Sequence, residues 1–146
     1  MSYTQPQTTI VAAAAASLSS PNHTRMTRKI TTHPTLPPHR RKIYLALLSV
    51  PPGRWTTYAA LAKHLGTSPR AIGAAMRLNP FAPEVPCHRV LGGGGKLLVG
   101  YSGGESGAKN AKDGVGMKRR MLEEEGVEFT GEGVARGVCF EGFGVV

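Results

Sequence analysis

The spacing of large apolar residues predicts several short helices. Between residues 40 and 48 these residues recur on one helical face, at Ile43, Tyr44, Leu47 and Leu48. A Pro-Pro-Gly run at 51–53 ends this helix. Residues 117–125 predict a final helix with one apolar side, and Gly126 stops it because glycine readily adopts the left-handed conformation common at helix ends.

The central part of the chain predicts two helices joined by a tight turn, over residues 58–65 and 70–79. Gly66 permits the positive φ that the turn needs. Small Ala62 lets the two helices cross closely, and Ile72 fills the space between them. This pattern is typical of a helix-turn-helix, although an ordinary helical hairpin has the same local signals.

The neighbouring segments complete the expected fold. Thr56 or Thr57 can cap the first of these two helices. Residues 96–99 predict a short strand, and 105–116 predict a flexible polar insertion. We therefore expect a mainly α fold: a small helical domain with a winged-helix-like helix-turn-helix and a short strand or hairpin near Cys87.

The two ends of the chain differ from its middle. Residues 1–38 are rich in Ser, Thr, Pro and Ala and lack the periodic large apolar residues that could offset the entropy lost on folding, so they predict a disordered basic tail. We expect the ordered domain to cover 39–126. Residues 127–146 alternate loosely around glycines and predict a C-terminal extension with a weak hairpin.

The chain is basic, and unevenly so. Lys and Arg outnumber Asp and Glu by 18 to 9, and no acidic residue precedes Glu84. A field of one sign over half the chain favours a polyanionic partner such as nucleic acid. Arg70 and Arg77 lie two turns apart on one face of the second predicted helix, which favours DNA binding. A tail that only keeps the protein soluble is the alternative.

Several function classes are excluded by composition. Cys87 and Cys139 are too few for a disulfide framework, and no C-x-x-C pair suggests a zinc site, so we predict reduced intracellular thiols, no metal and no cofactor. The longest apolar run, 10–16, is far shorter than the roughly 20 residues that span a bilayer, so we expect no membrane partner. No basic residue precedes Arg25, which argues against a mitochondrial or secretory leader, and we expect a nuclear protein.

The run Pro86-Cys87-His88-Arg89-Val90 contains the candidate chemistry. Cysteine reacts as the thiolate, and its pKa falls when a histidine, an arginine or a helix N-terminus stabilises the negative form. Cys87 is therefore a candidate nucleophile. Taken alone it is more typical of a small apolar residue that fills a core.

Several separate motifs, in this order along the chain, resemble one family. They are the helix-turn-helix, Asn79, the 86–90 run, Tyr101-Ser102-Gly103-Gly104 and Glu125-Gly126. Over about residues 40–126 the chain is similar to the C-terminal domain of O6-alkylguanine-DNA alkyltransferases. The resemblance implies irreversible transfer of an alkyl group, once per molecule, from guanine O6 in DNA to Cys87.

The same resemblance implies the roles of the site residues. Glu125 would orient His88, which would draw the thiol proton from Cys87 through a bridging water, because neighbouring side chains point in different directions. Tyr58 would donate a proton to guanine N3. Tyr101 and Ser102 would face O6, and the backbone carbonyls of Cys87 and Val90 would accept from the guanine amino group. Singly, Tyr58, Ser102 and Glu125 are typical of ordinary surface or turn residues.

The expected partner is double-stranded DNA that contains O6-alkylguanine. A base inside a duplex must be flipped out before its alkyl carbon can reach a buried sulfur. By resemblance, Arg70 inserts into the base stack, Asn79 ties the helix end to the active-site turn, and a recognition helix enters the minor groove. Small residues on that helix suit close approach: Ala71, Gly73, Ala74 and Ala75. We expect a monomer.

Three features depart from the family or leave alternatives open. Complete members carry an additional N-terminal domain, and in some members that domain has a zinc site. Residues 105–116 separate the Ser102 loop from Glu125.

One alternative function is an alkyltransferase-like sensor that binds the damaged base without repair and recruits excision-repair proteins. Those relatives replace the cysteine, usually with tryptophan. A transcription regulator is the other alternative, but it leaves Cys87 without a role.

Overall fold

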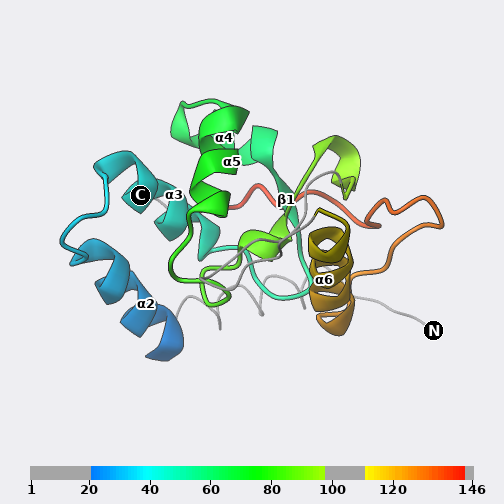
Figure 1. Cartoon of the computed structure of the whole chain (residues 1–146), viewed down its shortest axis with the longest axis horizontal. Helices are drawn as coiled ribbons and strands as arrows, with labels where there is room; N and C mark the ends of the chain where they lie inside the picture. Colours follow the sequence, from blue (N-terminus) through cyan, green and yellow to red (C-terminus); the bar gives the residue numbers. More distant parts are fainter. Residues whose placement is uncertain (1–20, 98–110, 144–146) are drawn as a thin grey trace.

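The computed structural model describes residues 21–97 and 111–143, and of residues 111–114 only the backbone. The described residues form a mainly helical fold with a two-stranded sheet, as the sequence predicts. The helices are α2 (Pro21–Thr31), α3 (Pro38–Leu47), α4 (Tyr58–Leu65), α5 (Pro69–Arg77) and α6 (Ala111–Glu124). Figure 1 shows α2 and α3 at one side of the molecule and α6 at the other, with β1 (Thr56–Thr57) between them.

Helices α4 and α5 form the predicted helix-turn-helix, and local signals define its ends. The Thr57 hydroxyl accepts a hydrogen bond from the first turn of α4, and the Ser68 hydroxyl does the same for α5. Pro69 occupies the first turn of α5. Gly66 ends α4 in the left-handed conformation, with φ of 67°. Buried Ile72 fills the space between the helices as predicted.

Helix α3 packs against this unit through a fully buried tyrosine. Tyr44 donates its hydroxyl proton to the backbone carbonyl of Ala75 in α5, with 2.7 Å between the oxygens. Its ring packs edge-on against Phe81. Ala75 is 1% exposed, so the expectation that it faces DNA with the other small residues of α5 is wrong.

A short parallel sheet joins the helix-turn-helix to the candidate nucleophile. Strand β1 leads directly into α4, and β2 (Val90–Leu91) follows the 3-10 turn η1 (Cys87–Arg89). Thr56 pairs with Val90 in parallel register. Thr57 pairs with Leu91, so α4 begins beside the C-terminal end of β2, and η1 leads into the opposite end of that strand.

Part of the expected disordered tail is folded. Helix α2 buries Met26 and Ile30 completely in the main core. The Arg41 guanidinium donates to backbone carbonyls at and beyond the end of α2, including those of Thr31 and Leu36. The prediction of disorder up to residue 38 is therefore wrong for Pro21–Thr31, because burial of two apolar residues and this cap stabilise the helix.

The C-terminal part also differs from expectation. Helix α6 begins at Ala111, inside the segment for which a flexible insertion was predicted. Beyond α6, Phe129 and Ala135 form an isolated antiparallel bridge in the segment predicted to hold a weak hairpin. The chain then passes along β1, where the Phe140 N–H donates to the Trp55 carbonyl at 2.7 Å. The predicted strand at 96–99 is reduced to isolated bridges at Lys96; residues 98 and 99 lie outside the described residues.

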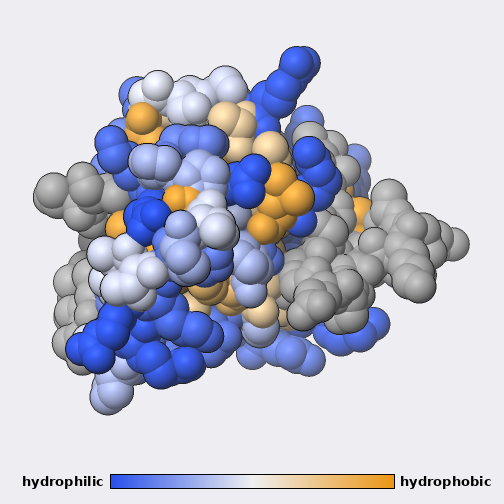
Figure 2. Space-filling model, turned by 60° about the vertical axis from the view of Figure 1, so that its left-hand side comes forward, coloured by the Kyte–Doolittle hydropathy of each residue, from blue (hydrophilic) through white to orange (hydrophobic). Residues whose placement is uncertain are grey.

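Hydrophilic side chains cover most of the surface seen in Figure 2, and apolar residues appear there as small separate patches. Not every basic residue is available to a polyanion. Arg25 forms an ion pair with Glu84, and Arg41 caps α2 as described. None of the helices among the described residues is long and apolar enough to cross a membrane.

Candidate active site

Cys87 lies at the start of η1 and is 5% exposed. Burial raises the pKa of its thiol above the ordinary value, and this outweighs the opposing effects of a hydrogen bond from Asn79 and the positive charge of Lys118. A thiol in this setting is protonated at neutral pH. It therefore needs a base before it can act as a nucleophile.

His88 is held by a carboxylate across the site. Its Nε2 donates to Glu125 Oε2 at 2.8 Å, and the histidine is 3% exposed. Since Nε2 carries the proton in this hydrogen bond, Nδ1 is the basic nitrogen of the neutral ring. The additional residues at 105–116 thus leave Glu125 within reach of His88.

Arg89 holds the same carboxylate from the other side. Its Nε and Nη2 donate to the two Glu125 oxygens at 2.9 and 2.6 Å, and its Nη1 donates to the Val50 carbonyl at 2.8 Å. Burial alone would raise the pKa of Glu125. Hydrogen bonds from His88 and Arg89 and the charge of Arg89 outweigh this effect and lower the pKa to about 2. Glu125 is thus a fixed anion at any physiological pH.

Asn79 fixes the loop that leads to Cys87. Its side-chain Nδ2 donates to the Val85 carbonyl at 2.9 Å, and its Oδ1 accepts from the Phe81 N–H at 2.9 Å. Both contacts are buried. The end of α5 is therefore tied to the residues just before Cys87, which is the arrangement that the resemblance implies for Asn79.

Tyr58 lies at the first turn of α4, close enough to Cys87 for their charges to interact. The Nζ atom of Lys118 in α6 donates to its hydroxyl oxygen at 3.3 Å. Burial, and secondarily the Cys87 thiolate, raise the pKa of Tyr58 to about 12. The phenol is therefore neutral at pH 7 and can act as a proton donor.

The residues expected to contact DNA divide into two groups. Arg70 is exposed at the start of α5, and three small residues of the same helix are partly exposed: Ala71, Gly73 and Ala74. Val90 is fully buried in β2, so only its backbone could meet a base. Tyr101 and Ser102 lie outside the described residues.

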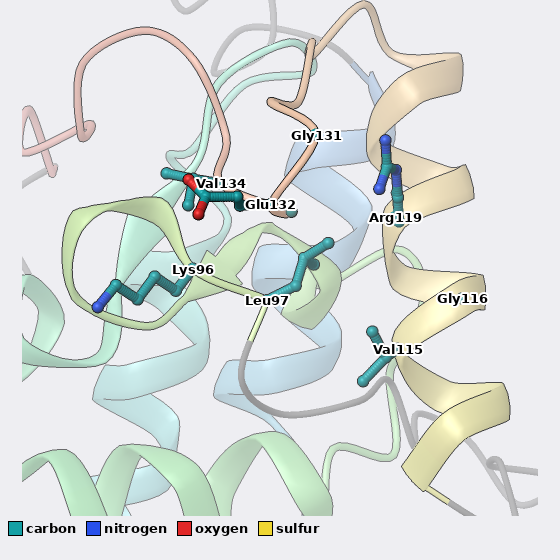
Figure 3. Close-up of a pocket in the computed structure, with 9 residues that line it drawn as sticks. Lys96, Leu97, Val115, Gly116, Arg119, Gly131, Glu132 and Val134 are labelled. Atoms are coloured by element: carbon teal, nitrogen blue, oxygen red, sulfur yellow. The ribbon is translucent and has the colours of Figure 1, made fainter.

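A cavity lies between α6, the chain at Lys96 and Leu97, and the turn at 131–134. Figure 3 shows Val115 and Arg119 on α6 at one side of it and Leu97 at another. Residues 98–110 connect two of these walls along the sequence, so we assign no ligand to it. Within 21–97 and 111–143, no group of three or more His, Cys, Asp or Glu side chains is arranged to hold a metal ion.

Two residues of this site were not predicted for it. No separate role is predicted above for Arg89, and Lys118 is one of several basic residues in the final predicted helix. No local signal pairs Arg89 with Glu125, which lies 36 residues further along the chain. For Lys118 a signal was present: it precedes Glu125 by seven residues, which is about two helical turns, so the two residues fall on the same side of the helix.

Comparison with protein families decides the relationship. Residues 38–127 match the family model described as 6-O-methylguanine DNA methyltransferase, DNA binding domain. The chain belongs to the 6-O-methylguanine DNA methyltransferase family. A methylated-DNA–protein-cysteine methyltransferase of Saccharolobus islandicus is 40% identical over 91 residues, which are 62% of this chain and 52% of that protein. The chain thus spans about half the length of this curated relative.

Solved structures of the family support the fold. The O6-methylguanine-DNA methyltransferase of Pyrococcus kodakaraensis is 31% identical, with a TM-score of 0.53, over 84% of this chain and 66% of that one. Atl1 of S. pombe, solved with damaged DNA containing O6-carboxymethylguanine, is 26% identical with a TM-score of 0.50. That match covers 67% of this chain and 86% of Atl1.

Proposed function

We propose that this protein repairs DNA by moving an alkyl group from O6 of guanine to the sulfur of Cys87, irreversibly and once per molecule. The observation that carries the proposal is the intact Cys87 beside a histidine that Glu125 holds at 2.8 Å. Membership of the family and the name of the S. islandicus relative support the same activity. The proposal concerns direct transfer and requires no cofactor.

The geometry suggests how the thiol is activated. Glu125 fixes His88 with Nε2 protonated, so Nδ1 can take the thiol proton through a water molecule. The fixed anion then stabilises the positive imidazolium. The thiolate attacks the alkyl carbon in line, the carbon–oxygen bond breaks, and its electron pair moves to the guanine. Tyr58 donates a proton to guanine N3 as the base leaves.

The helix-turn-helix would present the damaged base. In the proposal α5 lies in the minor groove of double-stranded DNA, where the partly exposed Ala71, Gly73 and Ala74 allow close approach. Arg70 is exposed and fills the gap that the flipped nucleotide leaves. Binding would rest on phosphates and shape, so it should weaken as salt rises. A monomer in the nucleus remains our prediction.

Intact-mass measurement tests the transfer. The protein is incubated with a duplex that contains one O6-methylguanine, and a transferase gains the mass of one methyl group on Cys87. Cys87→Ala should gain nothing. Cys139→Ala is the matched control, because Cys139 is the other free cysteine and should leave the gain intact. Preferential binding of the damaged duplex without any gain in mass would overturn the proposal.

That last result would instead support a sensor. Similarity to Atl1, which was solved with damaged DNA containing O6-carboxymethylguanine, is the observation behind this second candidate. A sensor would hold the alkylated base and recruit excision-repair proteins. The retained Cys87 and its His88–Glu125 pair favour transfer over sensing.

Arg70→Ala tests base flipping. If Arg70 fills the gap in the stack, this variant should transfer the methyl group from duplex DNA more slowly, by about tenfold, yet react with free O6-methylguanine at the normal rate. The exposed Lys63→Ala change, which removes one charge from α4, serves as the matched control. Equal losses on the duplex and the free base would remove Arg70 from this role.

A further inference from the structure

The side chain of Lys118 lies inside the protein beside the proposed reaction centre. Only 2% of its surface is exposed. Its Nζ donates to Tyr58 Oη at 3.3 Å and lies 5.5 Å from the centroid of the Tyr58 ring. Lysine is rarely buried because taking its charge out of water costs free energy, so a buried lysine at this place calls for a role.

The direction of this hydrogen bond matters for chemistry. Lys118 has only donor hydrogens while it is protonated, so the phenol oxygen of Tyr58 accepts. The hydrogen of the Tyr58 hydroxyl therefore points away from Lys118. It is available to another acceptor, which in the proposed function is guanine N3.

We propose that Lys118 is a positioning residue for protonation of the leaving guanine: it orients the Tyr58 hydroxyl and replaces the proton that Tyr58 gives away. The inference rests on the proposed function and deepens it. As the carbon–oxygen bond breaks, its electrons move to guanine, the Tyr58 proton passes to N3, and the Lys118 ammonium passes a proton to the phenolate. The products are alkylated Cys87, neutral guanine, neutral Tyr58 and neutral Lys118, with the thiol proton on His88.

The proton affinities agree with this sequence. Burial lowers the pKa of Lys118 to about 8, although the nearby Cys87 thiolate opposes that shift. Burial raises the pKa of Tyr58 to about 12. The Lys118 ammonium therefore predominates at pH 7, yet it yields its proton to a phenolate readily. Among the described residues, Tyr58 of α4 and Cys87 of η1 are titratable groups that interact with Lys118.

A double-mutant cycle tests the link between the two residues. Single-turnover methyl transfer from duplex O6-methylguanine is measured for Lys118→Met, Tyr58→Phe and the double variant. We expect Lys118→Met to slow transfer about 10²-fold, a typical loss for impaired acid catalysis. The double variant should be no slower than Tyr58→Phe, since Lys118 acts through Tyr58. Losses that multiply would overturn the inference. Arg120→Met, an exposed change on α6, is the control.

A second substrate separates leaving-group protonation from thiol activation. Iodoacetamide also alkylates Cys87, but iodide needs no proton to leave. Lys118→Met should therefore slow alkylation by iodoacetamide less than about fivefold. Equal losses with both substrates would assign Lys118 to the sulfur and overturn the inference. If the wild-type protein gains no methyl group, the proposed function fails and this inference with it; normal transfer by Lys118→Met overturns the inference alone.

The pH profile gives a readout that a purely structural role would not move. Wild-type transfer should fall as the pH rises through about 8, because the ammonium of Lys118 is lost. Lys118→Arg keeps its charge in this range, so its rate should stay level there and should exceed that of Lys118→Met. Thermal unfolding identifies the variants that fold. If Lys118→Met does not fold, the test relies on the comparison of Lys118→Arg with the wild type. An unchanged fall in Lys118→Arg would contradict the proposal.

Discussion

Two helix contacts in this protein are each built around a tyrosine, and they use it in opposite ways. At the contact between α3 and α5, Tyr44 donates its proton to the Ala75 carbonyl. At the contact between α4 and α6, Tyr58 accepts a hydrogen bond from Lys118. Burial raises the pKa of both phenols to about 12, so both are neutral at pH 7.

The difference between the contacts lies in where the phenol proton points. The Tyr44 proton is used by the backbone, and the residue is fully buried among apolar side chains of the main core. The Tyr58 hydroxyl accepts from Lys118, so in the proposal its own proton is left for the guanine, and Tyr58 is only partly buried. Equal pKa values therefore do not identify a catalytic group. The direction of the hydrogen bond and access to the site distinguish the two.

The largest expected effect is that of Tyr58→Phe. Loss of the proton donor should slow methyl transfer from duplex O6-methylguanine about 10³-fold, within the range for general acid catalysis. The melting temperature should change little, because phenylalanine keeps the ring. Single-turnover intact-mass kinetics and thermal unfolding measure both. A large loss of stability with normal transfer kinetics would contradict this prediction, because Tyr58 would then have a structural role like that of Tyr44.

Glu125→Gln should have the next largest effect. Without the anion, His88 is a weaker base, and we expect transfer to slow about 10²-fold in the same assay. Glu125→Asp is not a suitable control, because the shorter side chain would not reach His88 and Arg89. Glu128→Gln, an exposed change nearby, should leave the rate unchanged.

The same variant predicts a change in acid stability. The pKa of Glu125 is about 2 in the folded protein, below its ordinary value of 4.5, so folding favours the ionised carboxylate. This contribution is present above pH 4.5 and is lost as the pH falls toward 2. Urea unfolding at several pH values should show a smaller loss between pH 4.5 and 2 for Glu125→Gln than for the wild type.

Tyr44→Phe tests the structural tyrosine. The change leaves the buried Ala75 carbonyl without this hydrogen bond, and we expect the free energy of unfolding to fall by about 1–3 kcal/mol. Methyl transfer at a temperature where the variant is folded should match the wild type. Urea denaturation and the mass assay check these outcomes. Slow transfer by a well-folded Tyr44→Phe would show that the α3–α5 contact also serves the reaction.

The smallest effect is expected for Ser68→Ala. The Ser68 hydroxyl caps α5 by accepting from the Ala71 N–H at 3.1 Å, and loss of a cap costs about 1 kcal/mol. Urea denaturation measures it, with Ser68→Thr as the control that keeps a hydroxyl. A much larger loss would mean that the cap supports the Tyr44 contact as well as the helix end.

The sequence by itself determined the helix-turn-helix and pointed to Cys87 as the candidate nucleophile. Thr57, Gly66, Ser68 and Pro69 act on backbone groups a few residues away, so their effect does not depend on the rest of the fold. The motif around Cys87 and the final Glu125-Gly126 also placed the chain near the right family. The contact of Glu125 with His88 agrees with the role implied for it.

Only the tertiary structure decided which charges meet. Arg89 reaches Glu125 over 36 residues of sequence, and Lys118 reaches Tyr58 over 60. The fold of α2 likewise depends on burial of Met26 and Ile30 in a core made by other segments. Local patterns predict a helix or a cap, but partners distant in sequence are set by how α6, η1 and α4 pack. That packing places Lys118 within hydrogen-bond distance of Tyr58, the proposed proton donor.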